Sequence, residues 1–356
     1  MNHMTNRLRV LAVLALVLAL GNPVFAGGGR QPSSSSPSGN TSDVSGKLMI
    51  YTSIYEDVIE ALDEALEKKF PNADIQFFYG GTGNLQAKIA AEMDAGKLGC
   101  DLLLVAEPSY SLELKERGLL HPYISPYADR LAFDYDKEGY WYPVRICNMV
   151  LAYNPEKVAK NTIPNSLRDF AFDSSVRGLI SMGNPLTSGT TMAAVTALRD
   201  KYGYEYFQGL GNQGVKVESG SVALTKLQTG ECKVIMILEE SILKVREEDD
   251  SKLEVIYPTD GTIIIPSTVM TVADQWNANK NTKLAEAITD WLLSDEGQEN
   301  IVKGWMHSPI KNFSKLPYDG IPTTQIMANQ IPVNWENVYR QREEIRTRFE
   351  EYVTRR

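Results

Sequence analysis

The chain has 356 residues, of which 43% are hydrophobic and 23% charged, and its formal net charge is −9. This composition is typical of a globular protein with a sizeable core. The acidic balance argues against a nucleic-acid-binding protein, which needs a basic face. It does not exclude a small anionic ligand, because the site for such a ligand is local.

The N-terminal residues have the pattern of a secretory signal peptide. Arg7 and Arg9 precede an apolar run from Val10 to Leu20, and small residues lead to a cleavage site after Ala26. The run is about half of the roughly 20 residues that a membrane helix needs. No cysteine lies near the cleavage site to accept a lipid. Residues 1–26 are therefore predicted to be a signal peptide of a soluble, periplasmic protein, with a retained anchor as the alternative.

Residues 27–46 are rich in Gly, Ser and Pro and predict a flexible leader. The remaining chain, 47–356, is too long for one small core and suits two lobes. Strand-like and helix-like segments alternate along it, which favours an α/β architecture. The expected strands are 47–53, 73–80, 100–106, 148–154, 178–183, 215–219, 233–238, 253–258 and 262–272, the last interrupted at Pro266, and the expected helices include 55–70, 84–95, 282–293, 296–304 and a charged one at 334–352.

Small and hydroxyl residues gather where strands lead into helices. Ser53 and Glu56 fit a capping box. Three further helix starts have the sequences "GGTG" (80–83), "SGT" (188–190) and "SGS" (219–221). Each can be read as local capping. If the fold brings them to one cleft at the carboxyl ends of the strands, their free amides form a seat for an anion.

No catalytic motif stands out in the chain. "GLGNQG" (209–214) has the spelling of a dinucleotide-binding loop but follows a helix and leads into a strand, which is the reverse of the required context. His121 and His307 are the only histidines after the signal peptide, too few for a histidine-rich metal site. The sequence therefore predicts neither an enzyme nor a cofactor or metal site. The three cysteines, Cys100, Cys147 and Cys232, contain no CxxC pair, and the sequence does not choose disulfide partners among them.

Several stretches together resemble the periplasmic solute-binding proteins of ABC importers, in the subgroup of ferric-ion, thiamine, 2-aminoethylphosphonate and hexose-phosphate binders. They are "CDLLLVAEPSYSLELKERGLL", "YPVRICNMVLAYN", "GNPLTSGTT", "SGSVALTKLQTGE", "IYPTDGTIIIPSTVMTV" and "DWLLSDEGQENIVKGWMHSPIKN". The resemblance implies the two-lobed type II fold, with a mixed sheet flanked by helices in each lobe and the ligand in the inter-lobe cleft. It also implies delivery of the solute to an inner-membrane permease with its cytoplasmic ATPase. The expected lobes are 47–146 with 268–316, and 147–267 with 317–356.

The ligand follows less directly from the resemblance. Ferric-ion binders of this subgroup have adjacent tyrosines where this chain has Glu239 and Glu240. The expected ligand is therefore a small organic solute bearing a phosphate or phosphonate, with one of the two glutamates accepting hydrogen bonds from its other end. Ferric ion and thiamine, or thiamine phosphate, remain alternatives, as does a sensor that presents its closed form to a receptor. A monomer is expected.

The predicted ligand site combines the helix starts with nearby charged residues. Arg145 is either a charge-assisted contact to the ligand or a structural ion pair. The complete predicted set is Ser53, Thr82, Gly83, Glu107, Arg145, Ser188, Gly189, Thr190, Gly220, Ser221, Glu239 and Glu240.

Overall fold

Nine strands form the centre of the protein, which is described here from a computed structural model that covers residues 44–277 and 279–355. The predicted signal peptide and most of the predicted leader lie outside the described residues. The strands are β1 (Gly46–Thr52), β2 (Ala73–Tyr79), β3 (Leu102–Ala106), β4 (Tyr142–Tyr153), β5 (Ile180–Gly183), β6 (Lys216–Glu218), β7 (Val234–Leu238), β8 (Glu254–Ile256) and β9 (Ile263–Thr271).

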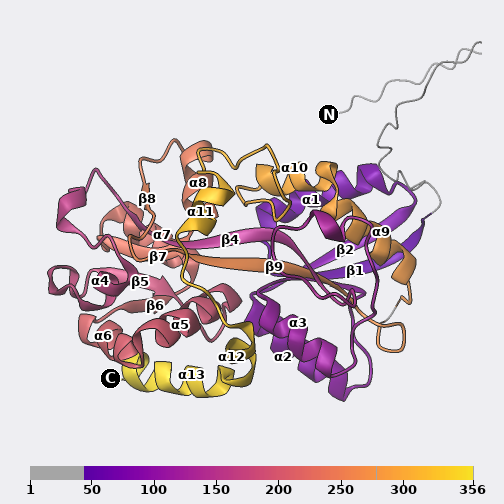
Figure 1. The fold of residues 1–356 in the computed structure, drawn as a ribbon, viewed down its shortest axis with the longest axis horizontal. Coiled ribbons are helices and arrows are strands. Elements are labelled where there is room, and N and C mark those ends of the chain that lie inside the picture. The colour runs from indigo at the N-terminus through magenta and orange to yellow at the C-terminus, as the bar shows by residue number, and fades with distance from the viewer. Residues whose placement is uncertain (1–43, 278, 356) are drawn as a thin grey trace, which may run out of the picture. The chain divides into compact units, whose positions relative to one another are not determined.

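The strands pair in the order β2-β1-β3-β9-β4-β7-β5-β6, and β8 pairs with β4. β1, β2 and β3 are parallel to one another, and so are β5, β6 and β7. The long strands β4 and β9 are antiparallel to each other and to their outer neighbours, and they join the two parallel sets. Figure 1 shows β4 and β9 running between the two groups of elements. The alternation of strands and helices in the sequence thus gives the expected mixed α/β fold.

The helices cover both groups of strands (Figure 1). They are α1 (Glu56–Lys69), α2 (Thr82–Asp94), α3 (Pro108–Glu116), α4 (Leu167–Phe172), α5 (Gly189–Tyr202), α6 (Glu205–Gln213), α7 (Gly220–Thr229), α8 (Glu239–Glu248), α9 (Thr282–Leu293), α10 (Asp295–Lys303), α11 (Thr323–Ala328), α12 (Trp335–Arg340) and α13 (Arg342–Phe349).

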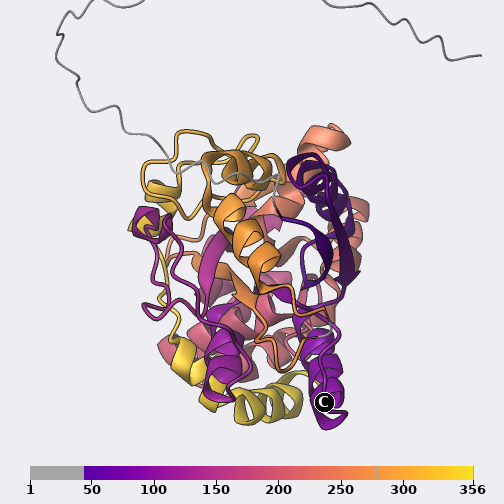
Figure 2. The ribbon, with the colours of Figure 1, turned by 90° about the vertical axis from the view of Figure 1, so that its right-hand side faces the viewer.

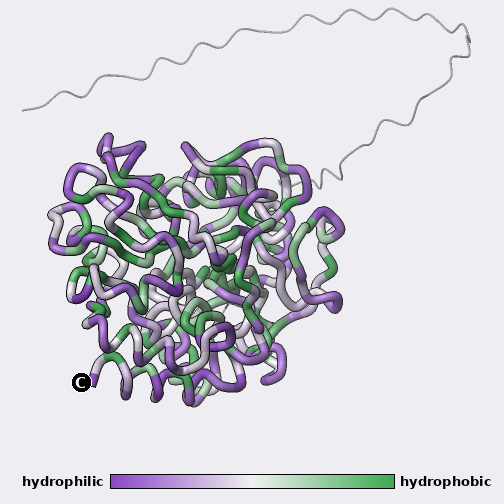
Figure 3. The backbone as a smooth tube through the Cα atoms, turned by 60° about the vertical axis from the view of Figure 1, so that its left-hand side comes forward, coloured by the Kyte–Doolittle hydropathy of each residue, from purple (hydrophilic) through white to green (hydrophobic). Residues whose placement is uncertain are grey.

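The buried hydrophobic side chains divide into clusters that follow the two sets of parallel strands. Two clusters draw on residues 48–144 and 269–310, and we call this part the first half. Two other clusters draw on residues 147–265 and 331–349, and we call this part the second half. Figure 3 shows that hydrophobic residues concentrate in the interior and hydrophilic residues on the outside. Hydrogen bonding is continuous through β4 and β9, and the described residues form one contact unit, so the exact lobe boundaries stay a prediction.

Two local expectations are wrong. β9 is not interrupted at Pro266, because the opposite residue, Ile146, exchanges backbone hydrogen bonds with His307 and does not need an N–H from position 266. The charged C-terminal segment is not one helix, since it breaks at Gln341 between α12 and α13. The break separates α12, which contacts α3, from α13, which packs into the second half.

The C-terminal helices run from one half to the other along a single face. Val338 of α12 and Ile345 and Phe349 of α13 are fully buried in the core of the second half. α12 also contacts α3 of the first half and α5 of the second. Figures 1 and 2 both show these yellow helices on the face that holds α3. All three cysteines are buried and unpaired.

Candidate functional site

The carboxyl ends of the two sets of parallel strands face each other along β4. Ala106, the last residue of β3, pairs with Ser267 of β9, which pairs with Arg145 of β4. Leu238, the last residue of β7, pairs with Met149 of β4. Only four positions along β4, from 145 to 149, separate the two strand ends. Ligands bind at the carboxyl ends of strands in open α/β sheets, so the segments that follow these strands form the candidate site.

The starts of α2 and α5 meet across this boundary. The N–H of Gly83 donates to the carbonyl oxygen of Thr187 at 3.1 Å. A Cβ atom on Gly83 would lie 2.6 Å from the carbonyl oxygen of Leu186, and one on Gly189 would lie 2.9 Å from Thr82. The backbones can approach this closely only because both positions are glycine. The structure therefore brings together Thr82, Gly83 and Gly189 of the predicted site.

Ser188 caps α5, as the interpretation of this stretch as a local helix cap predicted. Its hydroxyl oxygen accepts from the N–H of Thr191 at 3.2 Å and lies 3.0 Å from the hydroxyl of Thr190. The first N–H groups of a helix have no acceptor within the helix. Capping uses the amide of Thr191, and the amides of Gly189 and Thr190 remain at the helix start. Capping and anion binding are thus compatible at this helix.

Glu107 lies at the start of α3 in an unusual backbone conformation. Its φ is 72°, a value that non-glycine residues rarely adopt and that is often found at functional sites. Its carboxylate accepts from the N–H of Ser109 at 2.8 Å. Burial raises the pKa of Glu107 to about 7, although the nearby Arg342 guanidinium acts to lower it. A buried acid that titrates near neutrality is a candidate for contact with a ligand.

Ser53 supports the segment that leads to Glu107 and does not cap a helix. Its hydroxyl accepts from the N–H of Ala106 at 3.0 Å. The N-cap of α1 is Tyr55, which makes no side-chain capping bond, so the predicted capping box is wrong. The Ser53 hydroxyl, which the capping box would have placed against the N–H of Glu56, instead bonds the backbone of Ala106 on β3.

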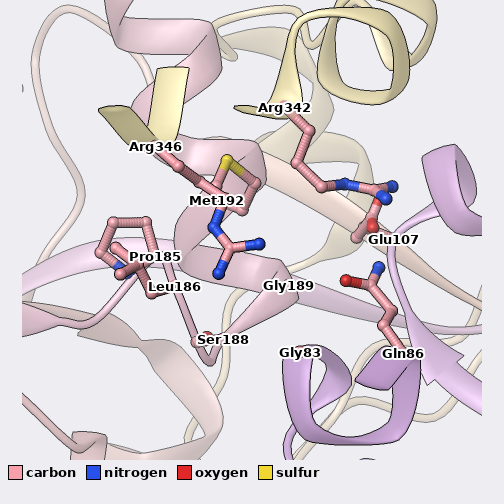
Figure 4. Close-up of a pocket in the computed structure, with 10 residues that line it drawn as sticks. All are labelled: Gly83, Gln86, Glu107, Pro185, Leu186, Ser188, Gly189, Met192, Arg342 and Arg346. Carbon is pink, nitrogen blue, oxygen red and sulfur yellow. The ribbon is translucent and has the colours of Figure 1, made fainter. Parts of the chain in front are cut away.

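A small pocket lies where these helix starts meet (Figure 4). Its volume is about 10 Å³, roughly the space of one water molecule. Four predicted residues line it: Gly83, Glu107, Ser188 and Gly189. The sequence reasoning missed the other side chains of the lining, above all two arginines; the full remainder is Gln86, Pro185, Leu186, Met192, Arg342 and Arg346.

The two arginines come from α13, more than 150 residues after Gly189 in the chain. Arg342 donates to a Glu113 carboxylate oxygen at 2.6 Å and to the Ser109 hydroxyl at 3.2 Å. It therefore ties α13 of the second half to α3 of the first. Arg346 pairs with Glu343 at 3.1 Å. Only the charged character of the C-terminal helix could have drawn attention to them from the sequence.

Glu239 and Glu240, at the start of α8, lie in a buried polar cluster. One Glu239 carboxylate oxygen accepts from Asn148 at 2.9 Å and lies 3.0 Å from His307 Nε2, and the other accepts from the Tyr257 hydroxyl. Burial acts to raise the pKa of Glu239, but these hydrogen bonds together hold it below its ordinary value. Glu239 is thus fully engaged within the protein.

Glu240 is less well satisfied. Its Oε1 lies 3.9 Å from Arg145 Nη1, and both side chains are buried. Within the described residues, Glu240 Oε1, Arg145 Nε and Asn148 Oδ1 are buried without a hydrogen-bond partner. Burial raises the pKa of Glu240, against the effect of Arg145. Both interpretations of Arg145, as a structural ion pair and as a contact to the ligand, therefore remain supported. Arg145 pairs with Glu240, yet its Nε has no hydrogen-bond partner among the described residues.

The start of α7 differs from the other predicted helix starts. Ser219 caps it by accepting from the N–H of Val222 at 3.3 Å. Ser221 is exposed and lies 3.1 Å from the Ser219 hydroxyl. Neither Gly220 nor Ser221 lines the described pocket. The structure thus brings the starts of α2, α3 and α5 together there, without α7.

Two general findings bear on function. Among the described residues, no group of three or more His, Cys, Asp and Glu side chains is placed to hold a metal ion. Within residues 44–277 and 279–355, none of the helices combines the length and the apolar character needed to cross a membrane.

Two sequence comparisons place the chain among solute-binding proteins. A family model for bacterial extracellular solute-binding proteins matches residues 100–322, more than half of the chain. A protein of Sinorhizobium fredii named "Probable ABC transporter periplasmic-binding protein" is 22% identical over 77% of this chain and 78% of its own.

Solved structures show the same architecture. The periplasmic binding protein AfuA of Actinobacillus pleuropneumoniae, bound to fructose-6-phosphate, superimposes with a TM-score of 0.75 at 22% identity, covering 87% of this chain and 99% of its own. Iron-bound HitA of Pseudomonas aeruginosa gives a TM-score of 0.74 at 19% identity, covering 86% and 99%. The chain therefore has the type II periplasmic binding fold and belongs to the bacterial extracellular solute-binding proteins.

Proposed function

We propose that this protein captures a small phosphorylated or phosphonate-bearing organic solute in the periplasm and delivers it to an inner-membrane permease. Export would use the predicted signal peptide, residues 1–26. The observation that carries the proposal is the pocket at which the starts of α2 and α5 meet two arginines of α13.

The chemistry of this pocket suits an anion with several oxygens. The start of a helix carries roughly half a positive charge and unpaired N–H groups, and Ser188 leaves the amides of Gly189 and Thr190 available. Guanidinium groups bind phosphate in a bidentate manner. Capture of an anion by a chain of net charge −9 is then a local effect of backbone amides and arginine at the pocket.

A solute needs the halves to separate before it can enter. The pocket has the volume of about one water molecule, and the backbones of Gly83 and Thr187 are in direct contact. β4 and β9 are the strands that link the halves, so bending along them would part the helix starts of α2 and α5. In the proposed cycle, the solute enters the open form and the two halves then close around it.

The other end of the solute is proposed to meet Glu240. Both carboxylate oxygens of Glu239 have hydrogen-bond partners, whereas Glu240 Oε1 has no hydrogen-bond partner among the described residues. A hydroxyl or amino group on the solute would satisfy it. Of the two glutamates in the predicted site, the hydrogen bonding favours Glu240 for this role.

Ferric ion and thiamine are weaker candidates. HitA contains iron in its solved structure, but it is only 19% identical to this chain, so the likeness supports the fold alone. Here carboxylates stand at 239 and 240, and Glu239 is held by Asn148, His307 and Tyr257. A sensor that presents its closed form to a receptor would use the same pocket, and a permease and an ATPase encoded beside the gene would favour transport.

A pair of substitutions at one position tests the anion seat. Asp and Asn cap helices about equally well, so Ser188→Asp and Ser188→Asn should both fold with normal stability. A carboxylate about 4 Å from a bound anion costs about 4 kcal/mol at an effective dielectric constant of 20. We therefore expect Ser188→Asp to weaken binding on the order of 10³-fold and Ser188→Asn to weaken it far less.

The measurement is calorimetric titration with a panel of sugar phosphates, phosphonates, thiamine, thiamine phosphate and ferric citrate, guided by native mass spectrometry of the purified protein. Binding of a phosphorylated compound that is equally strong in Ser188→Asp and in the wild type would show that the seat lies elsewhere. Selective binding of an uncharged compound or of iron would overturn the proposed solute class.

A further inference from the structure

The helix α13 presents two arginines to the pocket in different electrostatic situations. Arg342 and Arg346 are one helical turn apart and therefore lie on the same face. Ile345 and Phe349 fix the helix in the core of the second half. Figure 4 shows the guanidinium of Arg342 beside Glu107 and that of Arg346 extending past Met192 toward Gly189.

Arg342 is committed to protein partners. Its guanidinium makes a 2.6 Å contact to Glu113 and a 3.2 Å contact to the Ser109 hydroxyl, and only 13% of its side chain is exposed. Glu113 is also largely buried, at 18%. The charge of Arg342 is thus neutralised within the protein, and the contact joins α13 to α3.

Arg346 has a weaker attachment. Its ion-pair partner Glu343 lies three residues earlier on the same helix, at 3.1 Å, and 81% of the Glu343 side chain is exposed. Exposed pairs of this kind contribute only about 0–1 kcal/mol, because water screens them and both side chains lose freedom. An anion in the pocket can therefore displace Glu343 at little cost.

We propose that Arg346 is the cationic residue that selects the solute. Its guanidinium releases Glu343 and makes a bidentate contact with a phosphate monoester or phosphonate held at the start of α5. This inference rests on the proposed function and adds to it a residue and a reason for its choice. The amides of Gly189 and Thr190 supply two donors and the guanidinium of Arg346 two more, and the three oxygens of a phosphoryl group can accept all four hydrogen bonds.

Arg348 provides a matched control on the same helix. It pairs with Glu351 at 2.9 Å, three residues away, and 45% of its side chain is exposed. Within the described chain it does not belong to the lining of the pocket. Arg346→Ala and Arg348→Ala thus each remove one arginine and one exposed i,i+3 ion pair, but only the first changes the pocket.

The experiment is calorimetric titration of the wild type and both variants with fructose 6-phosphate and with fructose, together with thermal unfolding. Loss of one or two charge-assisted hydrogen bonds predicts about 10- to 100-fold weaker binding of the phosphorylated sugar to Arg346→Ala. Arg348→Ala should bind as the wild type does, all three proteins should unfold at similar temperatures, and Arg346→Lys should retain part of the affinity.

Two results would overturn the inference in distinguishable ways. Equal affinity of Arg346→Ala and wild type for the phosphorylated sugar would remove Arg346 from the site while leaving the proposed function intact. Wild-type protein that binds fructose as strongly as its phosphate would refute selection of an anion, and with it the proposed function.

Discussion

The buried pair of Arg145 and Glu240 gives a prediction with a pH signature. The two side chains are 3% and 4% exposed, and their nearest charged atoms are 3.9 Å apart. Arg145 Nη1 contacts the sulfur of Met306 at 2.8 Å, while among the described residues Arg145 Nε and Glu240 Oε1 have no hydrogen-bond partner. The pair is therefore buried with part of its hydrogen-bonding capacity unused, so its desolvation is only partly offset.

Removing either partner should be costly, but to different extents. Glu240→Gln leaves a buried guanidinium that cannot lose its proton, and we expect the free energy of unfolding to fall by about 3–5 kcal/mol. Arg145→Met leaves a carboxyl group that can take up a proton. Relative to an ordinary pKa of 4.5, protonation at pH 7 costs at most about 3.4 kcal/mol, at 1.36 kcal/mol per pH unit.

The loss in Arg145→Met should depend on pH, and its sign can be worked out. Burial already raises the pKa of Glu240, and loss of Arg145 raises it further. The folded state then holds the proton more tightly than the unfolded state, so stability is lost as pH rises above 4.5. We expect a loss below about 1 kcal/mol at pH 5 that grows toward pH 7.

Urea unfolding of the wild type, both single variants and the double variant at pH 5 and pH 7 provides the test. The double variant Arg145→Met/Glu240→Gln should lie within about 1 kcal/mol of the wild type or above it, because neither charge of this pair remains. Additive losses in the double variant, or an Arg145→Met loss that is the same at both pH values, would refute this account of the pair. If Glu240 also contacts the solute, the double variant should fold normally but bind it less well.

Three further predictions concern the pocket and its surroundings. Burial raises the pKa of Glu107 from 4.5 to about 7, so the stability that this group contributes is full below pH 4.5 and is lost as pH rises toward 7, by at most about 3.4 kcal/mol. In Glu107→Gln, the free energy of unfolding in urea should therefore change less with pH over that range. Gly83→Ala places a Cβ 2.6 Å from a backbone oxygen and should raise the radius of gyration in small-angle scattering, whereas Gly220→Ala, with nothing within 4 Å, should not. Ferric salts should give no phenolate-to-iron absorption band, because position 239 holds a carboxylate engaged by His307.

Local sequence signals predicted the features that depend on neighbouring residues. Runs of apolar residues gave the strands, and the Gly, Ser and Thr clusters marked the starts of α2, α5 and α7. The parallel strands then bring two of these starts together, which the rule for strand ends anticipates. Ser188 shows the agreement at the level of one residue, since its hydroxyl caps α5.

Long-range contacts account for what the sequence could not predict. The Ser53 hydroxyl bonds the backbone of Ala106, a contact 53 residues away that no local pattern reveals. Arg342 and Arg346 enter the pocket from the other end of the chain, and their helix begins only because the charged segment breaks at Gln341. Glu239 reads as a free carboxylate in the sequence, but residues 148, 257 and 307 engage it.

The contacts between the halves limit how far a solute can shift the equilibrium between the open and closed forms. Gly83 bonds Thr187, and Arg342 bonds Glu113, using protein groups alone. Closure therefore has a stability of its own, and a solute shifts it only by binding the closed form more tightly than the open one. Moving a population from 1% to 99% closed needs a difference of about 5.5 kcal/mol.

A permease that recognises the closed form requires that the free and loaded proteins differ. Arg342 favours closure whether or not a solute is present, because Glu113 satisfies it. Under the proposal above, Arg346 gains its strong partner only when an anion occupies the pocket, since its exposed pair with Glu343 contributes little. In the proposed cycle, Arg342 would therefore reduce the energy that a solute must supply, while Arg346 would make closure depend on the solute. Because both arise from one helix anchored in the second half, a change in α13 would alter affinity and closure together.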